Sequence, residues 1–206
     1  MKRKVVKVSD AEARLSQVRI RIHRDYDAMP PWEFSESPLV YWSPDYSNAE
    51  GATNCPTVVD AEGIEEIEPG ILCALVYAYE HGGVTVSTSQ TTPRGSQCGC
   101  VWCNEEEFRD FYGKDADFND VARRYVDDVN AFYNCDVYGV VAERWRDADR
   151  DWLEIGSIGN FYPSKWRFQE MISFFREPGR IVCANDSASE FIGLEYDEYK
   201  PTGDEQ

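Results

Sequence analysis

Alternation of apolar and polar residues identifies the first strands of the chain. Residues Val18 to Arg24 alternate strictly, which is typical of a strand with one buried face. Ile71 to Tyr79 is an apolar run too short for a surface helix, and it predicts a central strand. The two glycines of residues 80–83 permit a tight turn, so Val84 to Thr88 is expected to return as a hairpin partner.

Helical spacing of apolar residues predicts the helices. The clearest helix covers Asp117 to Asn134, and Asn104 can cap a shorter one over Glu105 to Tyr112. Glu62 to Glu68 is predicted to be a short acidic helix, and a further helix is expected from Pro163 to about Arg176. The buried stripe of the long helix is predicted to consist of Phe118, Val121, Tyr125, Val129 and Phe132.

The order of these elements indicates the fold class. Helices lie between and after strands that are mostly joined as hairpins, which predicts an α+β fold. We expect a mostly antiparallel sheet with three or four helices packed on it, in a single domain. Its segments are a basic N-terminal part over residues 1–16, a core over 17–184 and an acidic tail over 185–206. The remaining predicted strands are residues 39–42, 98–103, 136–145, 152–158 and 180–184.

The charge of the chain is strongly negative and unevenly distributed. The 206 residues contain 38 acidic and 21 basic side chains, a formal net charge of −17. Residues 1–25 carry +5, so the remaining 181 residues carry −22. A body this acidic repels nucleic acid and anionic lipid and attracts basic protein surfaces. We therefore expect neither a nucleic acid nor a membrane as direct partner; plain solubility and salt adaptation are the alternative explanations.

The seven cysteines have irregular spacing and follow no secretory signal, which predicts reduced thiols in a cytosol. Cys98, Cys100 and Cys103 lie within six residues and, with His81, could form a tetrahedral zinc site. In a strand, however, Cys98 and Cys100 face one side and Cys103 the other, so the three cannot converge without a bend. The sequence therefore favours buried cysteines, with no metal and no cofactor.

Two positions could support an enzyme. Asp25 and Asp27 follow the first strand, and paired carboxylates can hold Mg²⁺ or Ca²⁺. The same two residues also suit a turn in which the side chains bond their own backbone. His81 with the nearby Ser87 could serve a hydrolase, although no nucleophile elbow, P-loop or dinucleotide fingerprint is present. A small hydrolase or metal-dependent enzyme centred on His81 or on Asp25 and Asp27 is the alternative function.

Acidic residues gather in three parts of the sequence. Asp120 and Asp127 are about 10 Å apart along the axis of the long helix, and duplex DNA has one charge for about every 1.7 Å of axis. Rows of carboxylates on a folded surface can therefore occupy a nucleic-acid groove of another protein. A solvated helix face, partly neutralised by Arg123 and Arg124, is the alternative. The predicted partner-binding residues are Glu65, Glu66, Glu68, Glu105, Glu106, Asp117, Asp120, Asp127 and Asp128.

Four blocks of the sequence resemble a family of uncharacterised proteins carried by phages, prophages and plasmids. Residues 77–89 are similar to its most distinctive stretch, an aromatic strand followed by Asp/Glu-His-x-Gly-Ile/Val-Thr and Ser-Thr-Ser. Residues 18–32, 135–141 and 159–162 are similar to three other blocks. The chain departs from the family where Pro31-Trp32-Glu33-Phe34 replaces an Arg and a Trp-Asp-Asn, and where Cys98, Cys100 and Cys103 replace ordinary strand residues. The part from about residue 163 is an addition to the pattern.

This resemblance implies a setting and no activity: a mobile element inside a bacterial host. In that setting, an acidic protein without recognisable catalytic residues is predicted to be an inhibitor of host defence. We expect it to act in the bacterial cytoplasm on a basic, nucleic-acid-binding complex, of the anti-CRISPR or anti-restriction type. Its carboxylates would imitate phosphates, and it is not expected to be an enzyme.

Overall fold

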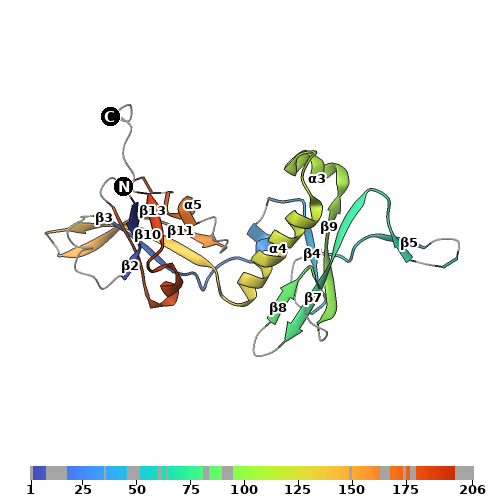
Figure 1. Ribbon diagram of the computed structural model, residues 1–206, viewed down its shortest axis with the longest axis horizontal. Helices are drawn as coiled ribbons and strands as arrows, with labels where there is room; N and C mark the ends of the chain where they lie inside the picture. Colours follow the sequence, from blue (N-terminus) through green and yellow to red (C-terminus); the bar gives the residue numbers. More distant parts are fainter. Residues whose placement is uncertain are drawn as a thin grey trace. The chain divides into compact units, whose positions relative to one another are not determined.

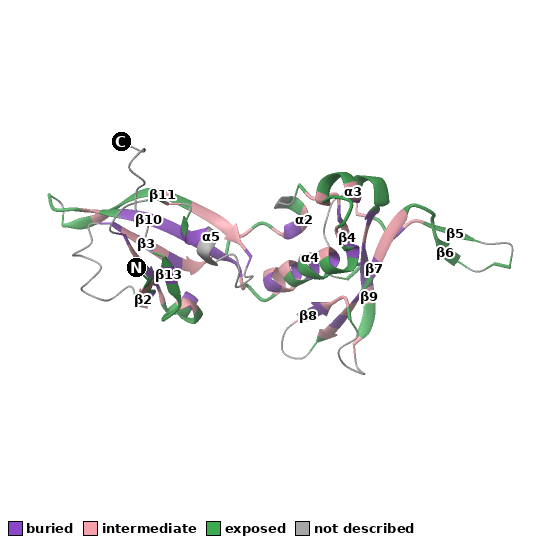
Figure 2. Ribbon diagram, turned by 45° about the horizontal axis from the view of Figure 1, so that its top comes forward, coloured by how far each residue is buried: buried purple, intermediate pink, exposed green. Residues whose placement is uncertain are grey.

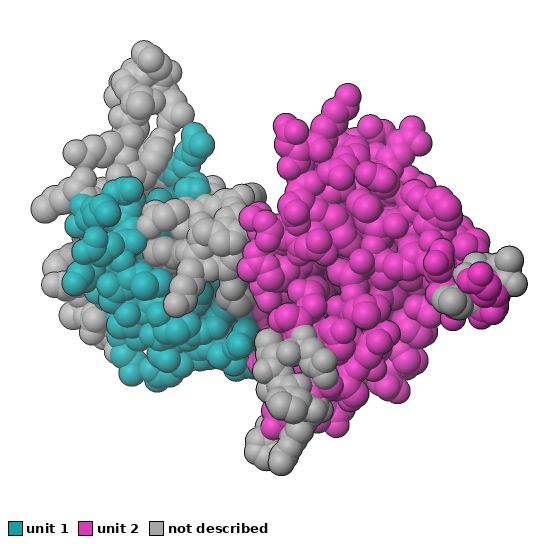
Figure 3. All heavy atoms as spheres, turned by 45° about the vertical axis from the view of Figure 1, so that its right-hand side comes forward, with its two compact units in different colours: residues 1–28, 135–206 teal, residues 29–134 magenta. Residues whose placement is uncertain are grey.

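The computed structural model describes residues 2–7, 18–34, 36–45, 52–59, 62–63, 65–80, 84–89, 95–148, 150–162, 168–173, 175–176 and 180–197. Two compact units result from the contacts within the chain (Figure 3). Unit 1 consists of residues 1–28 and 135–206, and unit 2 consists of residues 29–134. The sequence predicts a single core over residues 17–184. Periodicity shows that a segment is a strand or a helix, but it does not show with which other elements that segment packs.

Unit 1 contains a five-stranded sheet with the order β11-β10-β3-β12-β2 (Figure 1). Its strands, with a separate pair β1-β13, are β1 (Lys2–Lys4), β2 (Val6–Lys7), β3 (Val18–Arg24), β10 (Tyr138–Arg146), β11 (Asp151–Phe161), β12 (Ile181–Ala184) and β13 (Glu195–Asp197). β10 runs antiparallel to β3 and β11, as the sequence predicts for the hairpin. β12 runs parallel to β3 and β2.

The core of unit 1 lies on one face of this sheet. Ile20 and Ile22 of β3 are completely buried there, so the predicted alternation of β3 is confirmed. They pack with Val140 of β10 and with residues of α5 (Phe168–Ser173) and η2 (Asp186–Phe191). α5 lies within the predicted C-terminal helix, whose first residues are outside the described ranges.

The two ends of the chain belong to unit 1. The sequence predicts separate segments over residues 1–16 and 185–206, yet β1 pairs with β13 and β2 pairs with β12. The basic start of the chain therefore supplies strands, and so does part of the acidic end. Residues 8–16 and 198–206 lie outside the described ranges.

Unit 2 contains a four-stranded antiparallel sheet with the order β4-β9-β7-β8, and a two-stranded hairpin β5-β6. The strands are β4 (Val40–Trp42), β5 (Thr57–Val59), β6 (Glu65–Ile67), β7 (Ile71–Glu80), β8 (Val84–Ser87) and β9 (Ser96–Asn104). The predicted pairing of β7 with β8 is confirmed. The α+β class and the predominance of antiparallel pairing are also confirmed.

Helices cover one face of the unit 2 sheet. They are α2 (Pro31–Phe34), α3 (Glu105–Tyr112) and α4 (Phe118–Tyr133). Along α4, buried positions are interspersed with half-buried and exposed ones (Figure 2). Phe118, Tyr125 and Val129 are buried, as the predicted stripe requires, while Val121 and Phe132 are half-buried. No helix within the described ranges has the length and apolar character needed to cross a membrane.

The predicted acidic helix over Glu62 to Glu68 is wrong. The chain forms the hairpin β5-β6 there, with Val58 opposite Glu66 and Val59 opposite Glu65. Glutamate favours helices only weakly, and pairing with a β-branched strand that lies earlier in the chain outweighs that preference. Successive acidic side chains of this segment therefore point to opposite faces of a hairpin.

Candidate functional site

The negative charge of the protein is concentrated in unit 2. Unit 2 holds 19 acidic and 5 basic residues, a formal charge of −14. Unit 1 holds 19 acidic and 16 basic residues, a formal charge of −3. All nine residues predicted to bind a partner lie in unit 2, and all are exposed except the half-buried Asp128.

The first turn of α3 presents carboxylates to solvent. Asn104 caps this helix as predicted, since its side-chain oxygen accepts hydrogen bonds from the backbone N–H groups of Glu106 (2.8 Å) and Glu107 (3.4 Å). Acidic side chains near a helix N-terminus are stabilised by the helix dipole. The N–H of Glu105 donates to the carbonyl oxygen of Gly70 (2.8 Å). This bond joins the start of α3 to the segment that carries Glu68, so two of the three acidic groups adjoin.

The cation closest in sequence to these carboxylates is tied to the backbone. Arg109 lies 3.5 Å from Glu105 and also donates to the carbonyl oxygens of Lys114 (3.1 Å) and Ala116 (2.7 Å). Glu106, Glu107 and Asp110 make no ion pair with the part of the chain that the structure describes. This side of α3 therefore keeps an uncompensated negative charge.

A groove of about 380 Å³ lies beside these residues and is lined by Glu36, Pro38, Glu107, Asp110 and Phe111. The ring of Phe111 is 53% exposed. Carboxylates around an exposed aromatic ring suit an arginine or lysine side chain, because the carboxylates attract its charge and the ring face accepts it.

Sequence reasoning missed this groove because its two sides are distant in the chain. The hydroxyl oxygens of Ser37 and Tyr112 are 2.6 Å apart, and this hydrogen bond holds the segment around Glu36 against α3. The exposed Phe111 next to an acidic helix face was the only local signal.

The carboxylates of α4 are interleaved with cations. Asp117 caps the helix by accepting a hydrogen bond from the N–H of Asp120 (2.9 Å). Asp120 lies 2.8 Å from Arg123, which follows it by one turn. Partial burial raises the pKa of Asp127, and the charge of Arg123 acts in the opposite direction. Asp120 and Asp127 therefore flank Arg123, so the helix does not present the unbroken row of negative charge that the spacing suggests.

The hairpin β5-β6 carries the third acidic group. Glu65, Glu66 and Glu68 are exposed, and the hydroxyl of Thr57 donates to Glu65. Residues two apart in a strand point to the same side and are about 7 Å apart. Glu66 and Glu68 follow that spacing, with Glu68 one residue beyond the end of the strand. The hairpin thus adds separated carboxylates beside the start of α3.

The carboxylate pair at the end of β3 forms a turn. Asp25 accepts hydrogen bonds from the N–H groups of Asp27 (3.3 Å) and Asn160 (3.0 Å), one on each oxygen. Gly159 gives this carboxylate its space, because a Cβ there would lie 2.3 Å from it. Asp25 thus fixes the chain against β11, as the turn interpretation requires. His81 lies outside the described ranges, and Ser87 bonds Ser89.

The sequence predicts Cys98 and Cys100 on one face of β9 and Cys103 on the other, and the structure differs from this prediction at Cys98. Cys103 lies in the core beneath the helices, whereas Cys100 lies on the opposite face. A register shift opposite Cys98 lets that residue pack against the core cluster as well. Within the described residues, no group of three or more His, Cys, Asp or Glu side chains is arranged to hold a metal ion.

Comparison with known proteins adds no relative. No protein-family model, no curated protein and no solved structure matches the chain.

Proposed function

We propose that this chain is an accessory protein of a phage or other mobile element, and that it inhibits a nucleic-acid-binding defence complex of the bacterial host. Unit 2 binds the basic surface on which that complex receives nucleic acid, with carboxylates in the place of phosphates. The partner is a basic protein or ribonucleoprotein, such as a CRISPR effector or a restriction enzyme. The inhibitor itself contacts neither nucleic acid nor membrane.

The observation that carries this proposal is the segregation of charge between two units of similar size. A solubility role requires negative charge anywhere on the surface, whereas 14 of the 17 net negative charges lie in unit 2. Long-range attraction between surfaces of opposite charge speeds encounter and selects the partner. The α3 side, with Glu106, Glu107 and Asp110, is the part of unit 2 best suited to contact cations.

DNA cleavage by purified CRISPR effectors and restriction enzymes, measured with and without the protein, tests the proposal. We expect inhibition of at least one enzyme at low salt and a steep loss of inhibition as salt rises, because salt screens exposed charges beyond about 8–10 Å. Neutralising the α3 side with Glu106→Gln, Glu107→Gln and Asp110→Asn should weaken inhibition more than reversing Asp120, Asp127 and Asp128, which lie beside arginines on α4.

A matched control changes the charge by the same amount in unit 1. Asp151→Asn, Glu154→Gln and Asp197→Asn together remove three exposed carboxylates there. We expect this variant to inhibit as well as the wild type. Equal losses in the two triple variants would show that only total charge matters, and a protein that inhibits no member of the panel at low salt would contradict the proposal.

A further inference from the structure

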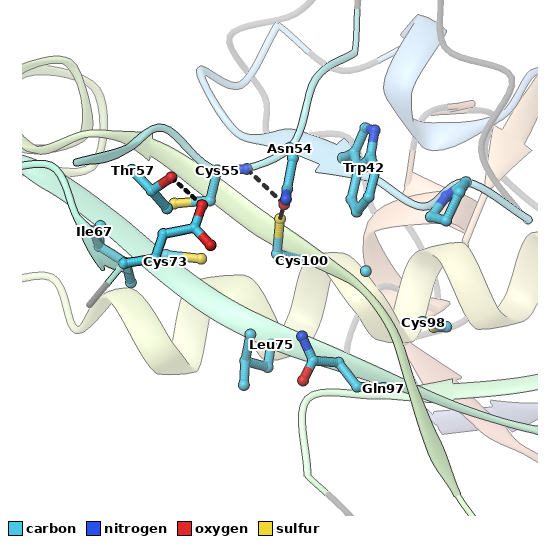
Figure 4. Close-up of a pocket in the computed structure, with 13 residues that line it drawn as sticks. Trp42, Asn54, Cys55, Thr57, Ile67, Cys73, Leu75, Gln97, Cys98 and Cys100 are labelled. Atoms are coloured by element: carbon cyan, nitrogen blue, oxygen red, sulfur yellow. Dashed lines mark hydrogen bonds between the residues drawn. The ribbon is translucent and has the colours of Figure 1, made fainter. Parts of the chain in front are cut away.

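Three cysteines from separate parts of the chain meet on the face of the unit 2 sheet that the helices leave uncovered. Cys73 lies on β7, Cys100 lies on β9, and Cys55 lies in the loop before β5 (Figure 4). They line one pocket of about 400 Å³, together with Trp42, Asn54 and Glu65. Cys55 and Cys100 are almost completely buried, and Cys73 is half-buried, so this pocket gives small solutes a route to the thiols.

The three thiols are neighbours in this pocket. The side chain of Cys73 lies close enough to Cys100 and Cys55 to influence the pKa of both thiols, and the Cys55 thiol donates to the carbonyl oxygen of Pro56 (3.8 Å). As a thiol, Cys100 donates to the side-chain oxygen of Asn54 (3.4 Å), which also accepts from the Cys55 N–H (2.9 Å). As a thiolate, Cys100 can instead accept from the Cys73 thiol and from the Cys55 N–H.

The three thiols differ in pKa because their surroundings differ. The neighbouring Cys73 side chain lowers the pKa of the Cys100 thiol, and the Cys55 N–H acts in the same direction, against the effect of burial. The neighbouring Cys100 side chain raises the pKa of Cys73, and burial raises the pKa of Cys55. Cys100 therefore carries the negative charge when one of the three ionises, and thiolates are the reactive form of cysteine.

Strand register decides which thiol can bond to Cys100. Cys73 pairs with Trp102, and Leu75 pairs with Cys100, so Cys73 and Cys100 are diagonal neighbours on adjacent strands. Diagonal neighbours are about 7–8 Å apart, beyond the Cα separation of about 4.4–6.8 Å that a disulfide permits. Cys55 is in a loop outside any strand, so strand register does not fix its distance from Cys100.

We propose that this cluster is a peroxide-reactive thiol site in which Cys100 is the oxidised nucleophile, Cys55 the resolving thiol and Cys73 a positioning residue. The oxidant is hydrogen peroxide, which is small enough to enter the pocket. The site is independent of the acidic surface, and it gives unit 2 a covalent link between β9 and the loop that leads into the β5-β6 hairpin.

The reaction proceeds in two balanced steps. The Cys100 thiolate attacks one oxygen of hydrogen peroxide, the O–O bond breaks, hydroxide leaves, and Cys100 becomes a sulfenic acid. The Cys55 sulfur then attacks the Cys100 sulfur, the S–O bond breaks, and the hydroxyl leaves as water with the proton of the Cys55 thiol. In sum, two thiols lose two electrons and form one disulfide, while one peroxide is reduced to two molecules of water.

Peptide mapping of the full-length wild-type protein after treatment with one equivalent of hydrogen peroxide tests the proposal without any variant. We expect a peptide pair linked by Cys55 and Cys100, lighter than the separate peptides by two hydrogen atoms and separated again by dithiothreitol. A link that contains Cys73 would overturn the assignment of roles. Unmodified Cys100 under conditions that oxidise the exposed Cys135 would overturn the site itself.

Variants separate the three roles. In Cys55→Ala we expect Cys100 to remain a sulfenic acid that dimedone captures, with no intramolecular disulfide. In Cys73→Ala we expect the Cys55–Cys100 link to form at pH 7 about tenfold more slowly, since an ordinary thiol is only a few per cent ionised there. Cys73→Ser keeps a hydrogen-bond donor and should restore most of the rate.

Cys135→Ser is the matched control, because Cys135 is exposed and lies in unit 1. We expect this variant to form the Cys55–Cys100 link at the wild-type rate. Equal rates in Cys73→Ala and Cys73→Ser would contradict the positioning role. Protection of all three thiols from peroxide by one equivalent of Zn²⁺ or Cd²⁺ would identify a metal-binding cluster in place of a redox site.

Discussion

The two units hold the same number of acidic residues and differ almost only in their basic ones. Each has 19 carboxylates in about one hundred residues, but unit 1 has 16 basic residues and unit 2 has 5. The difference of 11 in formal charge is thus a shortage of cations in unit 2, since the carboxylate counts are equal. A protein that needs only solubility has no reason to separate its cations in this way.

Several cations of unit 1 form ion pairs with carboxylates of the same unit. Glu143 is buried and lies 2.7 Å from Arg19 and 3.3 Å from Arg21, both on the neighbouring strand β3. Arg24 lies 2.8 Å from Asp136 and Lys7 lies 2.7 Å from Asp186. In unit 2, the comparable pairs are exposed contacts on one helix, such as Asp120 with Arg123. The buried pair at Glu143 therefore serves the structure of unit 1, whereas the described ion pairs of unit 2 are more exposed.

The largest expected effect tests whether the units are also separate in stability. Phe108 of α3 is completely buried and packs on Phe118, with ring centroids 5.4 Å apart. We expect Phe108→Ala to reduce the free energy of unfolding by about 3–5 kcal/mol. Hydrogen exchange should show faster exchange in β7 and β9 and unchanged protection in β3 and β10, because the two buried clusters share no residue.

Ile20→Ala is the matched change in unit 1, and it should produce the opposite pattern, with faster exchange in β3 and β10. If either substitution lowers protection in all four strands by the same amount, the units unfold together, and the comparison holds only for charge.

A somewhat smaller effect is expected from the buried charge of unit 1. Glu143→Ala leaves Arg19 and Arg21 without their shared carboxylate, and Arg19 is held further by the ring of Trp152, 4.2 Å from its guanidinium carbon. Removing one partner of a buried ion pair costs about 3 kcal/mol or more. Urea denaturation should show this loss in the free energy of unfolding. A loss below about 1 kcal/mol would place this pair in the class of exposed ion pairs.

Local patterns in the sequence are sufficient for most of the elements. The alternation of Val18–Arg24, the stripe of α4 and the cap at Asn104 each lie within a few residues, and the structure confirms them. The acidic hairpin β5-β6 was mistaken for a helix because its partner strand lies outside the window in which helical preference is judged. The type of an element is a local property only when no distant strand competes for it.

The distribution of charge and the thiol cluster could not be predicted, because both depend on contacts between distant residues. Along the sequence, the net charge changes from positive to negative near residue 25, so the basic start appears to be a separate segment. In the fold, β3 pairs with β10, more than a hundred residues away, so those cations meet carboxylates of unit 1. Cys55, Cys73 and Cys100 likewise come from a loop and two strands, and only the register of β7 and β9 brings them together.

The smallest expected effect on stability gives the sharpest test of the comparison. Arg123→Gln removes one of the five cations of unit 2 and breaks an exposed ion pair with Asp120, so the free energy of unfolding should change by no more than about 0.5 kcal/mol. Binding to a basic partner should become about twofold to fivefold tighter at low salt, and the gain should vanish at high salt.

Arg109→Gln also removes one positive charge from unit 2. It separates the effect of that charge on binding from the contribution of the side chain to stability. Arg109 also holds the carbonyl oxygens of Lys114 and Ala116, which connect α3 to α4. We therefore expect this variant to gain affinity but to lose stability by about 1–3 kcal/mol, since hydrogen bonds to charged groups are stronger than neutral ones. Titration calorimetry and urea denaturation of both variants measure the two quantities. If Arg123→Gln binds no more tightly than the wild type at low salt, the shortage of cations in unit 2 has no part in recognition.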